Sequence, residues 1–517
     1  MKAVYRLIAG ALAACAAAWP AVEAQAGTIA SPFPISPSSG SFASGGVVAS
    51  PAGNFLVDSS SSAGASLERF NSNGSELSST TSPGAWYSSD KLGNVPFTSN
   101  SGSSYYLSVL SGSNRVTVNQ VLVNDSNSPF FNPYGAITNG SGQIAVAWWS
   151  APGGSGPATE VFLREFNNGG NALCTSPVLA TAVSGSQLLG NFAMAVDGTG
   201  ITHVIYSVYT PNPSLAYTVV PHTLYYQRFS SSCAPLGNPV QVNAQASYDI
   251  EAMAVAADAL GNVVVAWEYY NPSRDYFDTY VQRYGPSLTT IGGNIAVNNQ
   301  AADSSLPPSQ ALALGMMDGG AFAIAYAEPR PGRPANSTDQ AVIWDTTVAE
   351  YDANRGLIGS PFVVSDLGYG AESPSLAMDP SGDYWVGWDK EDPLPVPYTS
   401  SGWAVRCRHP AQPASTVLRP PGVSLSGLAG TFASMSYYKI LVPAGAVNLR
   451  LSLGGSAAAT MYMRLGGLPT TSLYDLQQPG STGMVTVNVV NPPMGTYFIG
   501  IYGNSNYSGV SLQVSYY

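Results

Sequence analysis

Five stretches of the chain share one pattern of polar and hydrophobic positions. A turn residue (Asp, Asn or Met) is followed three positions later by Gly, and six positions after that Gly an apolar run ends in Trp or Tyr. The copies span residues 139–148, 197–206, 258–267, 317–326 and 379–388. The aromatic residues recur about every 60 positions, and a period of this length is typical of stacked repeat units.

Each copy predicts two β-strands joined by a tight turn, in which the polar side chain caps the backbone and Gly supplies a positive φ. A third strand carries a basic residue beside an aromatic, as in Arg228-Phe229, and a short fourth strand follows. Weaker copies begin near Val47 and Asp90. Four-stranded units that bury their faces against neighbours predict a β-propeller. The predicted fold is therefore all-β, with a seven-bladed propeller over residues 45–418 and six blades as the alternative.

The first 26 residues have the features of a secretory signal peptide. Lys2 and Arg6 precede an apolar run over residues 7–18, and Ala24 and Ala26 are small residues at the cleavage positions. We therefore expect a secreted, extracellular protein. The alternative is a lipid anchor on Cys15, which ends a lipoprotein-like sequence. Residues 27–44, rich in Pro and Ser, predict either a linker or a strand that closes the ring.

Charge is scarce in this chain. Only 9% of residues are charged and the formal net charge is −11, against about 25% charged residues in a typical soluble domain. A sparse acidic surface argues against nucleic acid and anionic membranes as partners. Beyond the leader, no apolar run is long enough to cross a bilayer, so we expect no transmembrane segment. We expect a monomer.

Three cysteines lie beyond the leader. Cys174 and Cys233 both follow the third strand of consecutive repeats, which makes them a candidate disulfide and leaves Cys407 free. Three unpaired thiols are the alternative. The cysteine spacing matches no metal-ligand pattern, so we expect no metal site and no cofactor.

After Pro421 the pattern changes, and residues 422–517 predict a separate antiparallel β-sandwich. This segment contains, in order, Gly427-Leu-Ala-Gly430, Tyr437-Tyr-Lys-Ile-Leu-Val-Pro443, Leu449-Arg-Leu-Ser-Leu453, Met461-Tyr-Met-Arg464, Tyr474-Asp475 and Gly495-Thr-Tyr497. It resembles the bacterial pre-peptidase C-terminal domain family. The resemblance implies a jelly-roll-like sandwich appended to secreted enzymes, often peptidases, with calcium bound in some members. The family's acidic stretch is here Ser456-Ala-Ala-Ala-Thr460, which argues against a calcium site of that type.

Catalytic motifs are absent from the sequence. None of His203, His222 and His409 lies in His-Glu-x-x-His, and there is no Gly-x-Ser-x-Gly. We expect His203 to be a structural residue within its strand. A carbohydrate-active hydrolase or lyase is the enzymatic alternative. Its candidate carboxylates lie just past the repeat aromatics, where a pair could act as acid and base or nucleophile. These residues are Glu268, Glu328 and Asp389, and the simpler interpretation is solvated loop acids.

The repeat aromatics and third-strand cations are predicted to be structural. Trp148, Tyr206, Trp267, Tyr326 and Trp388 occupy one position per repeat, which favours packing between blades over a sugar platform. The cations are predicted to pair with turn acids or carbonyls. They are Arg69, Arg164, Arg228, Arg283 and Arg406.

Loop length gives the main functional signal. Pro follows each repeat aromatic within five residues, so five long second-to-third-strand loops open on one face of the ring. Such insertions mark the binding face of a repeat protein, and flat rings with nearby polar groups suit carbohydrate. The candidate ligand-binding residues are Tyr209, Tyr217, Tyr269, Tyr270, Arg274, Tyr276 and Phe277.

The sequence therefore predicts a secreted, non-catalytic binding protein. Its expected partner is an extracellular polysaccharide or a surface protein, and the C-terminal sandwich would serve attachment or export. A structural cell-surface interaction protein is a further alternative to the hydrolase.

Overall fold

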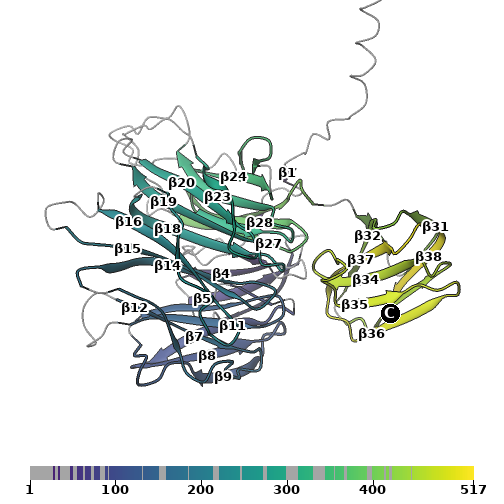
Figure 1. Ribbon diagram of the computed structural model, residues 1–517, viewed down its shortest axis with the longest axis horizontal. Helices are drawn as coiled ribbons and strands as arrows, with labels where there is room; N and C mark the ends of the chain where they lie inside the picture. The colour runs from purple at the N-terminus through teal and green to yellow at the C-terminus, as the bar shows by residue number, and fades with distance from the viewer. Residues whose placement is uncertain are drawn as a thin grey trace, which may run out of the picture.

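Strands account for the regular structure of the described residues, and no helix occurs among them. The computed structural model describes residues 27–28, 33–34, 47–49, 55–61, 64–71, 75–81, 88–90, 92–130, 132–150, 159–183, 185–212, 220–244, 247–271, 276–298, 312–329, 344–353, 356–365, 369–392, 399–412, 415–418, 422–443 and 445–517. Figure 1 shows the repeat region, in purple to green, beside a smaller C-terminal body in yellow.

Within the described residues, strands between positions 47 and 408 fall into seven consecutive antiparallel units, numbered here 1 to 7. Units 1 to 3 are β3 (Val47–Ala49), β4 (Phe55–Ser61), β5 (Gly64–Phe70) and β6 (Glu76–Thr81); β7 (Val95–Ser101), β8 (Ser104–Leu110) and β9 (Val116–Leu122); and β10 (Asn132–Thr138), β11 (Ile144–Ser150), β12 (Glu160–Phe166) and β13 (Val178–Ala182).

Units 4 and 5 belong to one continuous sheet, because β16 pairs with β18. Unit 4 is β14 (Leu188–Val196), β15 (Thr202–Tyr209), β16 (Pro221–Phe229) and β17 (Val240–Gln241); unit 5 is β18 (Ser247–Ala257), β19 (Val263–Asn271), β20 (Tyr276–Tyr284) and β21 (Thr290–Ala296).

Units 6 and 7 complete the series. Unit 6 is β22 (Leu312–Met316), β23 (Phe322–Pro329), β24 (Trp344–Asp352), β25 (Gly356–Leu357) and β26 (Phe362–Val363); unit 7 is β27 (Tyr369–Met378), β28 (Asp383–Asp392) and β29 (Thr399–Arg408). The N-terminal strands β1 (Gly27–Thr28) and β2 (Phe33–Pro34) both pair antiparallel with β29. The described part of the segment predicted as a linker or closing strand, residues 27–28 and 33–34, therefore adds strands to the last unit.

A cluster of buried apolar side chains lies between each unit and the next. Its members include Leu56 and Val95 for units 1 and 2, Leu107 and Val146 for 2 and 3, Ala147 and Val204 for 3 and 4, Tyr226 and Val265 for 4 and 5, Ala266 and Ile324 for 5 and 6, and Val348 and Val386 for 6 and 7. Units 7 and 1 share a further cluster, in which Phe55 stacks on Trp385 with ring centroids 5.4 Å apart. Each face of a unit is thus shielded by its neighbour.

The C-terminal body consists of two sheets that enclose one apolar core. One sheet is β30 (Thr416–Val417), β32 (Met435–Val442), β37 (Gly495–Gly503), β34 (Ala459–Leu465) and β35 (Leu476–Pro479); the other is β31 (Gly422–Gly430), β38 (Tyr507–Tyr516), β33 (Asn448–Gly454) and β36 (Val485–Val490).

The C-terminal body begins slightly earlier than the sequence boundary suggests. The sequence assigns residues up to 418 to the repeats, but β30 pairs in parallel with β32, and Leu418 lies in the C-terminal core. Burial of Leu418 explains why these residues associate with the C-terminal sheet.

Candidate functional site

The polar turns make the hydrogen bonds that their sequence predicts. In unit 5, Asp258 Oδ1 accepts the backbone N–H groups of Leu260 (2.9 Å) and Asn262 (2.8 Å). Gly261 has a φ of 85°, which favours glycine. A Cβ on Gly261 would also lie 3.2 Å from Asp197 Oδ2, so glycine lets the turns of units 4 and 5 approach each other.

These turns also bind one another across unit boundaries, at what we call the turn end of the units. Asn139 Nδ2 donates to Asp197 O (2.8 Å), and Gly319 N donates to Asp258 Oδ2 (2.9 Å). The loop end is the opposite end, where the second-to-third-strand loops leave the sheets. The turn end is therefore a polar network that fixes neighbouring units relative to one another.

The five repeat aromatics are buried between units, as the packing interpretation predicted. Their exposed fractions are 0% to 5%, and each belongs to the cluster that its unit shares with the preceding one: Trp148, Tyr206, Trp267, Tyr326 and Trp388. Rings enclosed in this way cannot form a sugar-binding platform.

Third-strand arginines bind backbone carbonyls or a turn acid, as predicted, and several of these bonds cross to a neighbouring unit. Arg69 donates to Gly93 O and Ser111 O, Arg228 to Pro286 O, and Arg283 to Asp352 O and Ala353 O. Arg164 instead reaches back to Val123 O at 2.9 Å, and Arg406 binds Asp383 within its own unit. Arg164 differs because Glu165 occupies the register position that Arg228 holds in unit 4.

The candidate carboxylates lie on three different units: Glu268 on β19, Glu328 on β23 and Asp389 on β28. Glu268 is 3% exposed. Its Oε1 accepts a 3.3 Å hydrogen bond from Thr279, whereas its Oε2 has no partner among the described residues. Burial raises the pKa of Glu268 to about 8. Glu268 and Glu328 are both buried, so the interpretation as solvated loop acids is wrong for these two.

Sequence reasoning missed two further buried carboxyls. Glu165 and Glu350 lie on the third strands of units 3 and 6, and burial raises the pKa of each to about 7. Gln143 Nε2 donates to Glu165 (2.6 Å), and Tyr384 Oη donates to Glu350 (2.6 Å). Both occupy the register position that Arg228 holds in unit 4, and this exchange of Arg for Glu was the available signal. The Tyr384–Glu350 bond joins units 6 and 7, whereas the Gln143–Glu165 bond lies within unit 3.

His203 and His409 have structural contacts. His203 Nδ1 lies 2.6 Å from Tyr226 Oη, and its Nε2 lies 3.2 Å from Asp197 Oδ2. His409 Nε2 lies 3.0 Å from Phe322 O. Both rings are buried, so neither is presented to a substrate.

His222 has a neighbour that the sequence does not reveal. Its ring stacks on Tyr209, with centroids 4.6 Å apart and planes 6° apart. His222 is 1% exposed, and burial lowers its pKa to about 4. His222 is therefore a neutral ring that stacks on Tyr209.

The structure describes part of the predicted ligand-binding set. Tyr209, Tyr269 and Tyr270 are half-buried near the loop end, whereas Phe277 is buried against Tyr270, with ring centroids 5.6 Å apart. Phe277 therefore packs the loop rather than facing a ligand. Tyr276 begins β20, and the placement of its side chain lies outside the described residues. Tyr217 and Arg274 also lie outside them.

Tyr209 lines a hollow of about 280 Å³ at the loop end of unit 4. Its walls are Gln187, Val208, Tyr209, Thr210, Pro221, Thr223 and Tyr225. The lining thus includes two tyrosines, one amide side chain and two hydroxyl side chains, and the amide and hydroxyl groups can donate and accept hydrogen bonds. The β16–β18 pairing, Pro221 with Tyr248 and His222 with Ser247, joins unit 5 to this edge.

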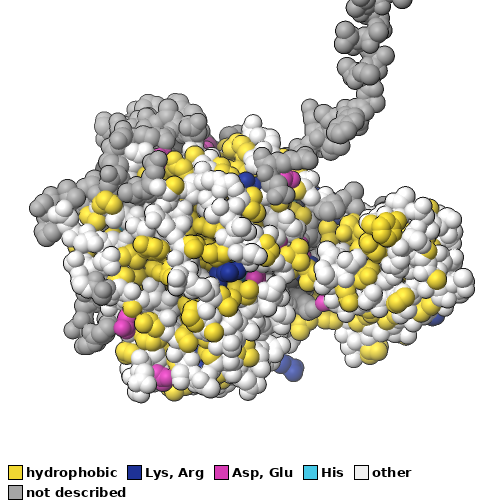
Figure 2. All heavy atoms as spheres, viewed as in Figure 1, with side chains coloured by type: hydrophobic (Ala, Val, Ile, Leu, Met, Phe, Trp, Pro, Cys, Tyr) yellow, Lys and Arg dark blue, Asp and Glu magenta, His cyan; other side chains and the backbone are white. Residues whose placement is uncertain are grey.

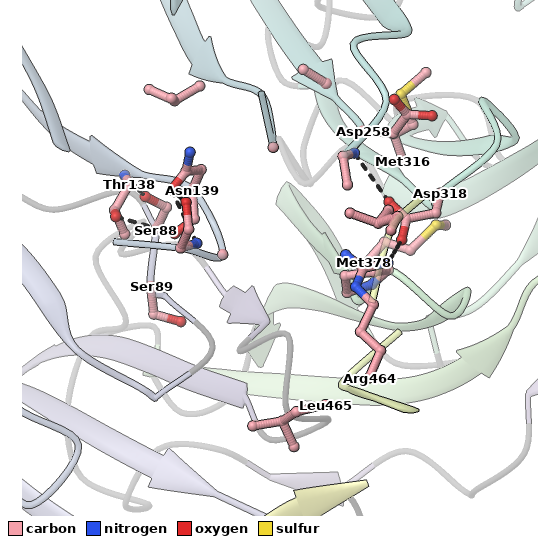
Figure 3. A pocket seen from close by; sticks show the side chains of 18 of the residues that line it. Ser88, Ser89, Thr138, Asn139, Asp258, Met316, Asp318, Met378, Arg464 and Leu465 are labelled. Carbon is pink, nitrogen blue, oxygen red and sulfur yellow. Dashed lines mark hydrogen bonds and ion pairs between the residues drawn. The ribbon is translucent and has the colours of Figure 1, made fainter. Parts of the chain in front are cut away.

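A second cavity, of about 310 Å³, lies at the turn end against the C-terminal body (Figure 3). Turn residues from units 2 to 7 line one side, and Arg464, Leu465, Leu473 and Asp475 line the other. Nothing in the sequence indicates this cavity, because it depends on how two separate parts of the chain meet.

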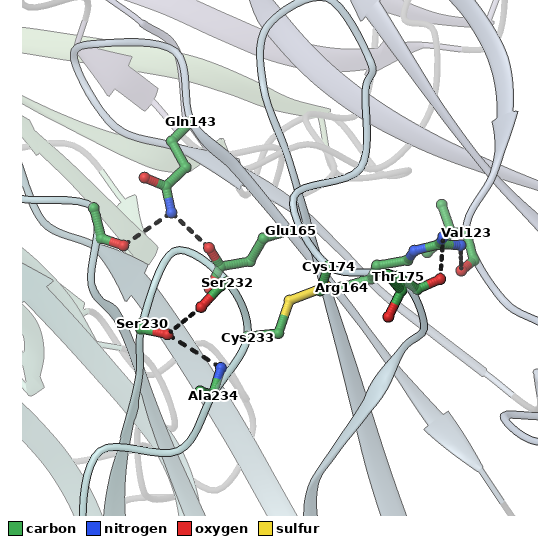
Figure 4. The surroundings of a disulfide bond; sticks show 11 residues. Val123, Gln143, Arg164, Glu165, Cys174, Thr175, Ser230, Ser232, Cys233 and Ala234 are labelled. Atoms are coloured by element: carbon green, nitrogen blue, oxygen red, sulfur yellow. Dashed lines mark hydrogen bonds between the residues drawn. A yellow bond between two sulfur atoms is a disulfide. The ribbon is translucent and has the colours of Figure 1, made fainter.

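Cys174 and Cys233 form a disulfide that links the turn ends of units 3 and 4 (Figure 4). Cys407 is free and buried. In the described part of the chain, no group of three His, Cys, Asp or Glu side chains is placed to hold a metal ion.

Charged side chains are sparse on the face of the molecule shown in Figure 2. Among the described residues, no helix has the length and apolar character needed to cross a bilayer.

Sequence comparison links part of the chain to bacterial proteases. It is 38% identical over 95 residues to alkaline serine exoprotease A of Vibrio alginolyticus, a match covering 18% of either chain. It is 34% identical over 103 residues to the virulence metalloprotease of Vibrio anguillarum, covering 20% of this chain and 16% of that protein. The chain therefore spans less than a fifth of these two curated relatives. No protein-family model matches it.

Structural comparison gives weaker likenesses. A Dyadobacter fermentans protein of unknown function has a TM-score of 0.42 at 11% identity, covering 74% of this chain and 99% of that one. A copper-bound fungal alcohol oxidase has a TM-score of 0.41 at 12% identity, covering 90% and 92%. Likenesses this low carry no inference about activity.

Proposed function

We propose that this chain is an extracellular, non-catalytic binding protein whose loop end recognises a glycan of a cell surface or matrix. The observation that carries the proposal is the hollow at the loop end of unit 4. Tyr209 and Tyr225 line it beside Gln187, Thr210 and Thr223. Aromatic faces with adjacent amide and hydroxyl groups stack on sugar rings and bind their hydroxyls.

The scaffold of this proposal is a seven-bladed β-propeller whose units lie between residues 47 and 408. Seven strand units, with an apolar cluster between each neighbouring pair and between the last and the first, support that architecture. Strands β1 and β2, paired with β29, would close the ring. The loops of all blades would then open on one face, around Tyr209, Tyr269 and Tyr270.

The C-terminal body is proposed to be a pre-peptidase C-terminal-type sandwich that serves attachment or export. Two sheets around one core and matches of about 95 to 103 residues to extracellular proteases support this assignment. Secretion has independent support, because disulfides such as Cys174–Cys233 persist in oxidising compartments.

Glycan-array screening, followed by pull-down with the insoluble polysaccharides it identifies, tests the proposal. Tyr209→Ala and Tyr225→Ala are each expected to weaken binding by about two- to tenfold, since a stacked aromatic contributes about 0.5–1.5 kcal/mol beyond its buried area. Tyr270→Ala is expected to have a smaller effect. Tyr474→Ala, an exposed tyrosine of the C-terminal body, is the matched control.

Two results would contradict the proposal. The first is a wild-type chain that binds no glycan at all. The second is release of reducing sugar from a bound polysaccharide that Glu268→Gln abolishes, which would favour the hydrolase.

A further inference from the structure

The cavity at the turn end is lined on one side by the C-terminal body (Figure 3). Ser89 and Asn139 contribute from units 2 and 3, and Asp258 and Asp318 from units 5 and 6. Ser89 is 5% exposed. The cavity thus lies where the turns of successive units converge, and Leu465 and Leu473 close it from the other side.

One ion pair joins the two sides. Arg464, near the end of β34, binds Asp318 in the turn of unit 6 through Nη1 and Oδ2. Both side chains are 13% exposed, and the residues are 146 positions apart. Asp318 Oδ1 also accepts the N–H of Ala259 at 3.0 Å. This bond therefore fixes the Asp318 carboxylate within the repeat region independently of Arg464.

Removing Arg464 would leave the buried Asp318 carboxylate without its cation, and this would destabilise the contact between the two bodies. Burial raises the pKa of Asp318, and the charge of Arg464 acts in the opposite direction. A desolvated carboxylate needs a compensating cation, so loss of Arg464 favours separation of the two surfaces and rehydration of Asp318.

The contact is close enough to be sensitive to a single methyl group. A Cβ on Gly467 would lie 3.0 Å from Pro380 Cβ in unit 7 and 2.8 Å from Arg464 Nη1. A larger residue at position 467 would push the C-terminal body away from unit 7 without changing any charge.

The connection between the two parts is short. Gln412 is fixed to unit 7, because its Nε2 donates to Ser381 O at 2.8 Å, and β30 already pairs with the C-terminal body from Thr416. A body released from the turn end would stay tethered beside it, and a short tether gives a high effective concentration for docking again.

From these contacts we propose that the C-terminal body is a lid over the turn-end cavity, held shut by the Arg464–Asp318 ion pair. Breaking the pair opens the cavity to solvent while both parts stay folded. The lid lies at the opposite end of the units from the proposed glycan site, and it does not depend on that function.

Thiol labelling tests the lid. Ser89→Cys places a reporter in the cavity, and its rate of reaction with N-ethylmaleimide measures opening. Arg464→Ala and Gly467→Val are each expected to raise that rate at least tenfold. Arg464→Lys should stay near wild type. Arg450→Ala removes an exposed cation from the same body and is the matched control.

Buried Cys407 separates opening from unfolding. If a variant merely unfolds, Cys407 is labelled together with the introduced thiol; if the lid opens, only position 89 reacts faster. Equal labelling rates at position 89 in the parent, Arg464→Ala and Gly467→Val would overturn the proposal. So would acceleration that always includes Cys407.

Discussion

The two ends of the same strands differ in how their polar groups are satisfied. At the turn end of β19, Asp258 accepts hydrogen bonds from the backbones of Leu260, Asn262 and Gly319 and from the Asn262 side chain. Toward the loop end of the same strand, the carboxyl of Glu268 receives one 3.3 Å hydrogen bond and leaves Oε2 without a described partner. On this strand, the turn end therefore stabilises the ring, whereas Glu268 keeps one unsatisfied carboxyl oxygen.

The largest expected effect at the turn end concerns its covalent link. Replacing Cys174 and Cys233 with serine opens a link between residues 59 positions apart. We expect a loss of about 2–4 kcal/mol in the free energy of unfolding. Urea denaturation of the double variant measures it, and Cys407→Ser is the control for thiol loss. A loss below about 0.5 kcal/mol would mean that hydrogen bonds alone hold units 3 and 4 together.

A direct comparison of the two ends uses Asp258→Ala and Tyr270→Ala. Asp258→Ala leaves several turn N–H groups without an acceptor and should cost about 2 kcal/mol, since each buried unsatisfied group costs about 1–3 kcal/mol. Tyr270 is half-buried at the loop end, and its removal should cost less than about 1 kcal/mol. Thermal unfolding gives both values, and equal losses would remove the distinction between the ends.

The smallest expected effect is a pH dependence from Glu268. Because burial raises its folded pKa to about 8, the stability it contributes is fully present below its unfolded pKa of about 4.3 and is lost as pH rises through about 8. Glu268→Gln should therefore reduce the fall in stability between pH 5 and pH 9. Urea midpoints at pH 5 and pH 9 test this, and an unchanged pH slope in the variant would contradict it. Glu165→Gln tests whether a similarly shifted carboxyl adds to the slope.

Local chemistry explains what the sequence predicts well. The turn at Asp258 can be inferred because the acceptor, the donors and the glycine lie within five residues of one another. Burial of Trp267 follows from its fixed position in each repeat. The candidate pairing of Cys174 with Cys233 rests on equivalent positions in neighbouring repeats, and the two sulfurs are bonded.

Contacts between distant segments explain what the sequence misses. The stacking of Tyr209 on His222 depends on the β15–β16 register, and the Arg464–Asp318 pair depends on how two bodies dock. Phe277 shows that composition alone does not identify a ligand-binding side chain. It lies in an aromatic-rich loop that predicts a ligand surface, yet it is 4% exposed.

Pairing of Gly27 with Arg408 brings together residues separated by almost the whole repeat region. During synthesis β1 and β2 are made first, but they cannot pair until β29 has been made near the end of the repeat region. Pairing across such a sequence separation is slow, because the chain loses the entropy of closing a long loop before the stabilising contacts form. Until then, unit 7 presents an unpaired strand edge to other chains, which makes the last stage of assembly the most exposed to aggregation.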